Sequence, residues 1–129
     1  MTIKKGSIKV EVGAQVSAYE LAAAEYLKTR GHEVVVIAPN RIARQRTADM
    51  RVDGVLWELK TPLGNSSRTV QGVLRRSKRQ SSRVIIDCRF TRRTDGQLVQ
   101  EARTSFQLVR SIERLWIIQK DGILTDLRK

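Results

Sequence analysis

An Asp-Gly pair at residues 53–54 separates two short runs that have the character of β-strands. The run before it is ADMRV, and the run after it is VLWELK. Asp-Gly between two such runs is a strong signal for a two-residue hairpin turn, because these residue types tolerate the positive φ angles of that turn. The sequence therefore predicts two adjacent antiparallel strands joined by a hairpin turn, and this pairing constrains the fold of the chain.

The rest of the chain alternates between helical and strand-like segments. Alanine, leucine and a stop at Gly31 favour a first helix, and amphipathic spacing favours the other two. The helices are expected at 14–30, 67–81 and 97–110, and the further strands in HEVVVIAP, in RVIIDCRF and in a hairpin RLWIIQKDGILTDL that turns at Asp121–Gly122. The order α-β-β-β-α-β-α-β-β predicts an α/β fold with a mixed sheet flanked by helices.

The length of 129 residues suits one compact domain. We expect that domain to cover residues 1–129, with a short flexible start at residues 1–8. The segment TRRTDGQ, residues 91–97, is expected to be an exposed basic loop.

The charge balance predicts a polyanionic partner. Lysine and arginine number 25 against 13 aspartates and glutamates, giving a net charge of +12. Such a surface favours nucleic acid. Five basic residues crowd the second helix without an intervening acid, and we interpret them as phosphate contacts, although a solvated helix face is the simpler alternative; they are Arg68, Arg75, Arg76, Lys78 and Arg79.

The chain shows no membrane or secretory signal. It has no apolar run near the length of a transmembrane helix, and its N-terminus lacks a long apolar core. Its one cysteine, Cys88, cannot form an internal disulfide and is expected to be a buried thiol. These features fit a cytoplasmic site of action, and they leave open delivery from another cell as part of a larger protein.

The predicted strand VLWELK contains two candidate catalytic residues. Side chains alternate along a strand, so Glu58 and Lys60 share one face while Trp57 and Leu59 share the other. If the hairpin turns at Asp53–Gly54, Asp49 in the preceding strand lies near Glu58. Two carboxylates bind Mg²⁺ or Mn²⁺, with Zn²⁺ as an alternative, and a neighbouring lysine can stabilise negative charge on a phosphate.

Two other acids have alternative interpretations. Glu20 lies on the apolar stripe of the first helix, where it would need a partner or a metal. The alternative is a capping box with Ser17, because SAYE places Glu20 three residues after a potential N-cap. Asp53 belongs first to the turn and only secondarily to a metal site. Asp87 fits either a buried acid near the site or an edge residue.

The Asp49 to Lys60 segment, with a glutamate-bearing helix upstream, resembles the PD-(D/E)XK nuclease superfamily. This resemblance implies a restriction-endonuclease-like core over residues 14–90. It also implies that Asp49 and Glu58 are metal ligands, Lys60 the catalytic lysine and Glu20 the helix acid. The chain departs from the signature at Ala48, where proline is common.

The segments DGVLWELKTP and KRQSSRVIID, with the basic helix and the terminal hairpin, are also similar to the C-terminal toxin domains of contact-dependent growth inhibition proteins. That resemblance implies a metal-dependent nuclease acting on tRNA and an acidic immunity protein as partner. Two alternatives stay open: a DNA endonuclease of the same fold, and a non-catalytic basic module that binds nucleic acid.

Overall fold

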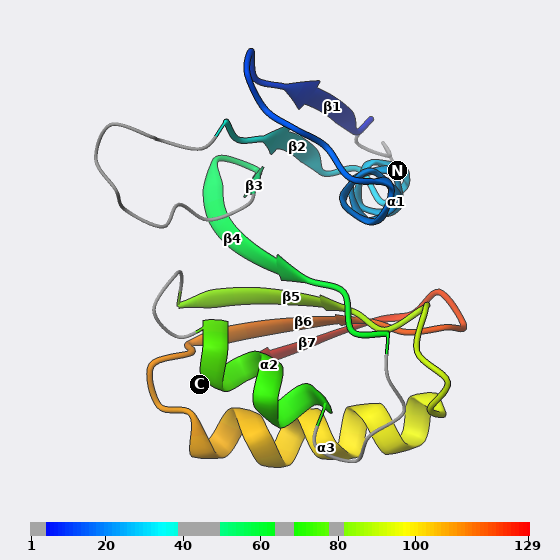
Figure 1. Ribbon diagram of the computed structural model, residues 1–129, viewed down its shortest axis with the longest axis vertical. Coiled ribbons are helices and arrows are strands. Elements are labelled where there is room, and N and C mark those ends of the chain that lie inside the picture. The colour runs from blue at the N-terminus through cyan, green and yellow to red at the C-terminus, as the bar shows by residue number, and fades with distance from the viewer. Residues whose placement is uncertain (1–4, 39–49, 64–68, 78–81) are drawn as a thin grey trace. The chain divides into compact units, whose positions relative to one another are not determined.

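The structure is a computed structural model that describes residues 5–38, 50–63, 69–77 and 82–129. Its strands follow one another in the order β1-β2-β3-β4-β5-β6-β7 in a seven-stranded sheet, and helices flank the strands (Figure 1). Parallel and antiparallel pairs both occur. The predicted mixed α/β class is therefore confirmed.

Residue contacts divide the chain into two units, Met1–Trp57 and Glu58–Lys129. The first unit holds β1, α1, β2, β3 and the first half of β4; the second holds the second half of β4, α2, β5, α3, β6 and β7. The prediction of one domain over residues 1–129 stays a prediction.

In the first unit, α1 (Ala18–Thr29) lies between β1 (Ser7–Val10) and β2 (Glu33–Val36) in the sequence. Ser17 is the N-cap of α1, and Gly31 follows its end with a φ of 88°. Gly31 N and His32 N donate to the carbonyls of Lys28 and Leu27, which satisfies the last turn of the helix. The predicted helical stop at Gly31 is confirmed.

The strand β1 is absent from the sequence prediction, which expected a flexible start at residues 1–8. Ser7–Val10 pair in parallel with Glu33–Val36. Gly6 immediately precedes this strand, and a Cβ atom there would lie 2.1 Å from the carbonyl oxygen of Lys28. Glycine therefore allows the chain to pass close to the end of α1 before it enters the sheet.

The hairpin predicted around Asp53–Gly54 is confirmed. Met50–Val52 form β3 and Val55–Lys60 form β4, paired antiparallel from Met50↔Trp57 to Val52↔Val55. Asp53 and Gly54 have φ angles of 51° and 82°, so both turn positions are left-handed. The core of this unit is formed by buried side chains of the helix and three strands, namely Ala23, Ala24, Leu27, Val34, Val36, Met50, Val52 and Trp57.

In the second unit, β4 pairs in parallel with β5 (Arg83–Asp87), β5 pairs in parallel with β6 (Arg114–Ile118), and β6 pairs antiparallel with β7 (Leu124–Arg128). Helices α2 (Thr69–Ser77) and α3 (Asp95–Leu108) lie on the same side of β5, β6 and β7 (Figure 1). The predicted terminal hairpin is confirmed, with its turn at Gly122.

The helices of this unit cover one apolar face of the strands. Alternate residues of β5 and β6, such as Val84 and Ile86, join the helices in one buried cluster. The predicted inward residues of α2 that the structure describes, Val70, Val73 and Leu74, are all buried; the side chain of Ser77 lies outside the described residues. The rest of the cluster consists of Cys88, Leu98, Ala102, Phe106, Val109, Ile112, Leu115 and Ile117.

The start of α3 corrects one expectation. Thr94 is its N-cap, and Thr94 and Gln97 form a capping box, so Asp95 and Gly96 lie in the first helical turn and not in a loop. The sequence Thr-x-x-Gln carries this signal. Arg93 is also less exposed than predicted, because its side chain is only 11% accessible and pairs with Glu101.

Candidate active site

Glu58 and Lys60 lie together on β4, as the alternation of its side chains predicts. Lys60 Nζ is 2.9 Å from Glu58 Oε1. The side chain of Glu58 is 2% exposed, whereas that of Lys60 is 31% exposed. The structure therefore places a buried carboxylate next to an ammonium group that reaches the surface.

The register of β4 and β5 defines the surroundings of this pair. Glu58 is the partner of Val84, and Lys60 is the partner of Ile86. Paired residues point to the same face of a sheet, and Val84 and Ile86 belong to the cluster that α2 and α3 cover. Glu58 and Lys60 therefore project from the face of the strand that carries these helices in the second unit.

A carboxylate in such surroundings requires compensation. Removing a charged group from water costs several kcal/mol unless hydrogen bonds and opposite charge offset the loss. Lys60 supplies part of that compensation at close range. A buried acid beside a partly exposed base, on the inner part of a sheet, is an arrangement that enzymes use for proton transfer and for binding hard cations.

The other two predicted catalytic acids are Asp49 and Glu20. Asp49 lies outside the described residues. Glu20 belongs to α1 in the first unit, where Glu20 N donates to Ser17 Oγ at 3.1 Å and Ser17 N donates to Glu20 Oε1 at 3.4 Å. The capping-box alternative for Glu20 is thus observed, and its carboxylate is partly exposed. Glu25 is exposed, as predicted.

Within residues 5–38, 50–63, 69–77 and 82–129, no three acidic, histidine or cysteine side chains gather closely enough to hold a metal ion. The predicted metal pair consists of Asp49 and Glu58, of which the structure describes Glu58. The oxygen atoms of a buried carboxylate suit Mg²⁺ or Mn²⁺. The chemistry of this donor therefore fits the expected cation.

The predicted nucleic-acid contacts belong to α2 and to its flanks. Arg75 is exposed on α2, and Arg76 also lies in this helix. Arg68, Lys78 and Arg79 lie outside the described residues. The described part of α2 contains no acidic residue, so its exposed face carries positive charge that nothing on the same helix neutralises.

The choice left open for Asp87 is resolved in favour of a buried acid. Asp87 is fully buried at the end of β5. Arg89, two residues further along the chain, donates two hydrogen bonds to Asp87: Nε lies 2.9 Å from Oδ1 and Nη2 lies 2.7 Å from Oδ2. Arg89 is not among the site residues predicted from the sequence. Its signal is an Asp-x-Arg that follows an apolar strand, since the arginine can fold back onto the acid.

Asp53 acts in the turn, and its carboxylate also joins the hairpin to β2. Asp53 Oδ1 accepts from Glu33 N at 2.9 Å, and Asp53 Oδ2 lies 2.7 Å from His32 Nδ1. The turn interpretation of Asp53 is confirmed. His32, which sequence alone could not assign, pairs with this turn.

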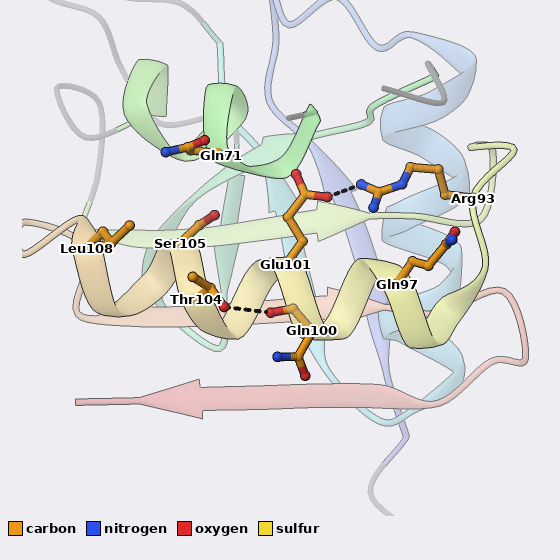
Figure 2. A pocket seen from close by; sticks show the side chains of 8 residues that line it. All are labelled: Gln71, Arg93, Gln97, Gln100, Glu101, Thr104, Ser105 and Leu108. Carbon is orange, nitrogen blue, oxygen red and sulfur yellow. Dashed lines mark hydrogen bonds and ion pairs between the residues drawn. The ribbon is translucent and has the colours of Figure 1, made fainter. Parts of the chain in front are cut away.

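A groove of about 390 Å³ lies between α2 and α3. Figure 2 shows Gln71 facing it from α2, and Arg93 paired with Glu101 at one side. Glu101 also accepts from Val70 N at 3.1 Å, so it caps the first turn of α2. The groove shares no lining residue with the Glu58–Lys60 pair, and most of its lining residues are glutamine, threonine or serine, which present mainly their apolar atoms to it. Its one charged pair among the described residues, Arg93 with Glu101, joins α3 to the segment before it and, through Val70 N, to α2.

The described residues contain no helix with the length and apolar character needed to cross a bilayer.

Comparisons with known proteins agree with the arrangement of strands and helices. The chain is similar in structure to a protein from a "CdiA-CT/CdiI toxin and immunity complex from Burkholderia pseudomallei", with a TM-score of 0.69 over 95% of this chain and 98% of that chain. The two sequences are 14% identical, so the likeness concerns the fold. No curated protein matches the sequence.

A family match covers the segment that carries the hairpin, the Glu58–Lys60 pair, both helices of the second unit and β6. Residues 46–124 match the family described as the contact-dependent growth inhibition CdiA C-terminal domain. The matched segment is more than half of the 129 residues. The chain therefore belongs to the CdiA C-terminal domain family, the toxin domains of contact-dependent growth inhibition.

Proposed function

We propose that this toxin domain is a metal-dependent nuclease of the PD-(D/E)XK type that hydrolyses phosphodiester bonds in tRNA. The observation that carries the proposal is the 2.9 Å pair of Lys60 with the buried carboxylate of Glu58 on a central strand. Nuclease activity is common among CdiA C-terminal toxin domains, which supports the reaction class.

The proposed cation ligands are Asp49 and Glu58. The buried position of Glu58 fits this role, since a carboxylate shielded from water binds a hard cation strongly. When bound, a divalent cation supplies polarisation of the scissile phosphate and makes an attacking water more acidic.

Lys60 has two proposed tasks. Its ammonium, partly exposed and held by Glu58, can contact a non-bridging phosphate oxygen and stabilise the negative charge that grows there during attack. It can also orient the attacking water by a hydrogen bond. Glu58 fixes the position of the ammonium in both cases, which lowers the entropy lost on reaching the transition state.

The basic surface has the proposed task of collecting the substrate. The net charge of +12 attracts RNA from solution, and the exposed Arg75 of α2 lies on a helix without acids. Arg68, Arg76, Lys78 and Arg79 extend this contact in the proposal. Positive charge on the flank of the site also means that affinity falls as salt rises.

We further propose that an acidic immunity protein covers this domain in the cell that makes it. The similar structure from Burkholderia pseudomallei was solved as a toxin and immunity complex. An acidic partner would bind a chain of this charge rapidly, because opposite potentials steer association. In this proposal the domain acts in the cytoplasm of a target cell, after delivery as part of a larger protein.

A cleavage assay tests the nuclease proposal. The purified protein is incubated with total tRNA and, separately, with plasmid DNA, each with Mg²⁺, Mn²⁺, Zn²⁺ or EDTA. The variants are Asp49→Ala, Glu58→Gln and Lys60→Ala. We expect metal-dependent cleavage of tRNA that each variant abolishes, while RNA affinity in EDTA changes by less than about threefold, because none of the variants removes the basic surface.

Matched controls separate chemistry from charge. Glu113→Gln and Lys120→Ala change exposed side chains of the same types in the second unit, and both are expected to cleave normally. Cleavage of DNA alone would keep the site but move the substrate to DNA. No cleavage with any metal, together with tight salt-sensitive binding, would contradict the nuclease proposal in favour of a binding module.

A further inference from the structure

We propose that Arg89 and Phe90 form a nucleotide-binding subsite at the carboxyl end of β5, in which the ring of Phe90 stacks on a base and Arg89 contacts the adjoining phosphate. The inference deepens the proposed nuclease function, on which it rests. It adds two residues outside α2 and outside the Glu58–Lys60 pair.

Arg89 is held in one position by a buried carboxylate. Asp87 is fully buried, and both of its oxygen atoms accept from the guanidinium of Arg89. Arg89 N also donates to Asp87 Oδ1 at 3.2 Å, so the backbone and the side chain of Arg89 are fixed by one carboxylate. A planar guanidinium held in one orientation loses little entropy when it binds a phosphate.

The side chain of Arg89 also reaches the surface. A quarter of the Arg89 side chain, 25%, remains exposed although its partner is fully buried. The guanidinium therefore links the interior to the surface, where it is placed to donate a hydrogen bond to a ligand.

An exposed aromatic ring lies beside Arg89. Phe90 is 40% exposed, and the guanidinium carbon of Arg89 lies 5.5 Å from the centre of its ring. Exposing such a ring to water is unfavourable, and an arginine next to an exposed aromatic ring is a frequent arrangement in proteins that bind unpaired nucleotides. The ring offers a face to a base while the arginine offers charge to its phosphate.

Arg89 and Phe90 follow the carboxyl end of β5, in the parallel part of the sheet. Lys60 is the register partner of Ile86, so Asp87 is the next residue of β5 beyond that pair. The strands β4, β5 and β6 are parallel, and ligands in such sheets bind outside the carboxyl ends of the strands. By strand alternation Asp87 points to the face opposite Ile86 and Lys60, so a strand of RNA whose phosphate meets Lys60 reaches the segment after β5 by passing over the carboxyl ends of the strands.

The local charge also favours a nucleotide over an acidic peptide. Arg92 is exposed in the same segment, which adds a second positive group within three residues of Phe90. An acidic peptide would need the cations alone. A nucleotide uses the cations and the ring together, and it is the ligand that accounts for both features.

Binding of RNA in EDTA tests the inference without cleavage. The probe is a short fluorescein-labelled oligoadenylate, and its dissociation constant is measured by anisotropy. We expect Phe90→Ala and Phe90→Leu to weaken binding at least about fivefold, and Phe90→Trp to retain it, because stacking needs a ring and not only apolar bulk. For an abasic strand of equal length, all three variants should bind like the unmodified protein.

Arg89 has a different expected signature. Arg89→Ala should weaken binding of both strands and lower the slope of log affinity against log salt by about 0.7. Arg89→Lys keeps the charge and should restore most of that slope. A purely structural role instead predicts a lowered melting temperature in Arg89→Ala with an unchanged salt slope. Arg103→Ala and Ile123→Ala remove an exposed arginine and an exposed apolar residue elsewhere in the unit; both should leave the affinity unchanged.

The outcomes are separable from those of the nuclease test. Loss of oligoadenylate affinity in Phe90→Ala, with normal affinity for the abasic strand and an unchanged melting temperature, supports the subsite even if the Glu58 and Lys60 variants have no cleavage to lose. Unchanged affinity in Phe90→Ala, or equal loss for both strands, overturns the subsite even if the protein cleaves tRNA.

Discussion

Lys60 Nζ lies 2.9 Å from Glu58 Oε1, and the one residue between them on the strand, Leu59, points the other way. The pleat of β4 therefore selects this acid and this base for one face, and no loop is needed to bring them together. A site built on a strand holds its groups more firmly than one built on a loop.

The pair should contribute to stability as well as to activity. Because Glu58 is buried, Lys60→Ala should lower the free energy of unfolding by about 1–3 kcal/mol. Urea titrations of Glu58→Gln, Lys60→Ala and the double variant give the coupling energy, which we expect at about 1–2 kcal/mol. Strictly additive single effects would show that the pair does not act as a unit.

Glu20 can be tested for a role beyond its cap. Glutamine also serves at the third position of a capping box, so Glu20→Gln should leave the melting temperature unchanged. If Glu20 takes part in catalysis, the same variant should lose most tRNA cleavage. Glu25→Gln, on the exposed side of the same helix, is the matched control and should cleave normally. Full activity of Glu20→Gln would restrict Glu20 to the cap.

Cys88 should be unreactive in the folded protein. Burial, and secondarily the charge of Asp87, raises the pKa of its thiol to about 12. At pH 8 a thiol reagent should therefore modify no cysteine until denaturant is added, after which it should modify the single cysteine of the chain. Rapid modification of the native protein would contradict the enclosed position of this side chain.

The same shift predicts how stability changes in alkali. The folded state keeps the Cys88 proton above the pKa of an unfolded cysteine, about 8.5. The unfolded state then binds fewer protons, so stability should fall as pH rises from about 8.5 towards 12. Cys88→Ala should remove that part of the slope, which melting curves between pH 7 and pH 10 would show.

Asp126 should stabilise the terminal hairpin except in acid. Burial raises the pKa of its carboxyl, but hydrogen bonds from Arg114 and Arg128 outweigh burial and lower it overall. A lowered pKa means that the contribution is complete above the unfolded value of about 3.9 and is lost as pH falls through the folded value. Asp126→Asn should cost about 1 kcal/mol at pH 7.

That difference should shrink below pH 4 and vanish once both forms of residue 126 are neutral. Asp121→Asn, in the turn of the same hairpin, tests whether any exposed aspartate gives this profile. A constant difference between the Asp126→Asn variant and the unmodified protein from pH 7 to pH 2 would assign the effect to packing and not to charge.

Local signals in the sequence predicted most of the elements. The turn at Asp53–Gly54 needs residues that accept positive φ, and the face of Glu58 and Lys60 follows from alternation alone. The cap and the stop of α1, at Ser17 and Gly31, are likewise short-range features. Each of these depends on neighbours within a few residues, which a sequence displays directly.

Features that depend on distant partners were harder to predict. The strand β1 consists of SIKV, mostly exposed, and only its pairing with β2 identifies it as a strand. The bond between His32 and Asp53 joins residues that lie 21 positions apart. The convergence of Asp49 and Glu20 on Glu58 is of the same kind, and it stays a prediction.

While the chain folds, the two halves of β4 can pair with their neighbouring strands at different times. Its first half closes onto β3 across a two-residue turn, an event of microseconds. Its second half must wait for β5, which follows only after α2, and parallel pairing across such a separation is slow. We therefore expect burial of Glu58 to be a late event, in which a newly folding toxin domain gains its hairpin first and its candidate catalytic pair afterwards.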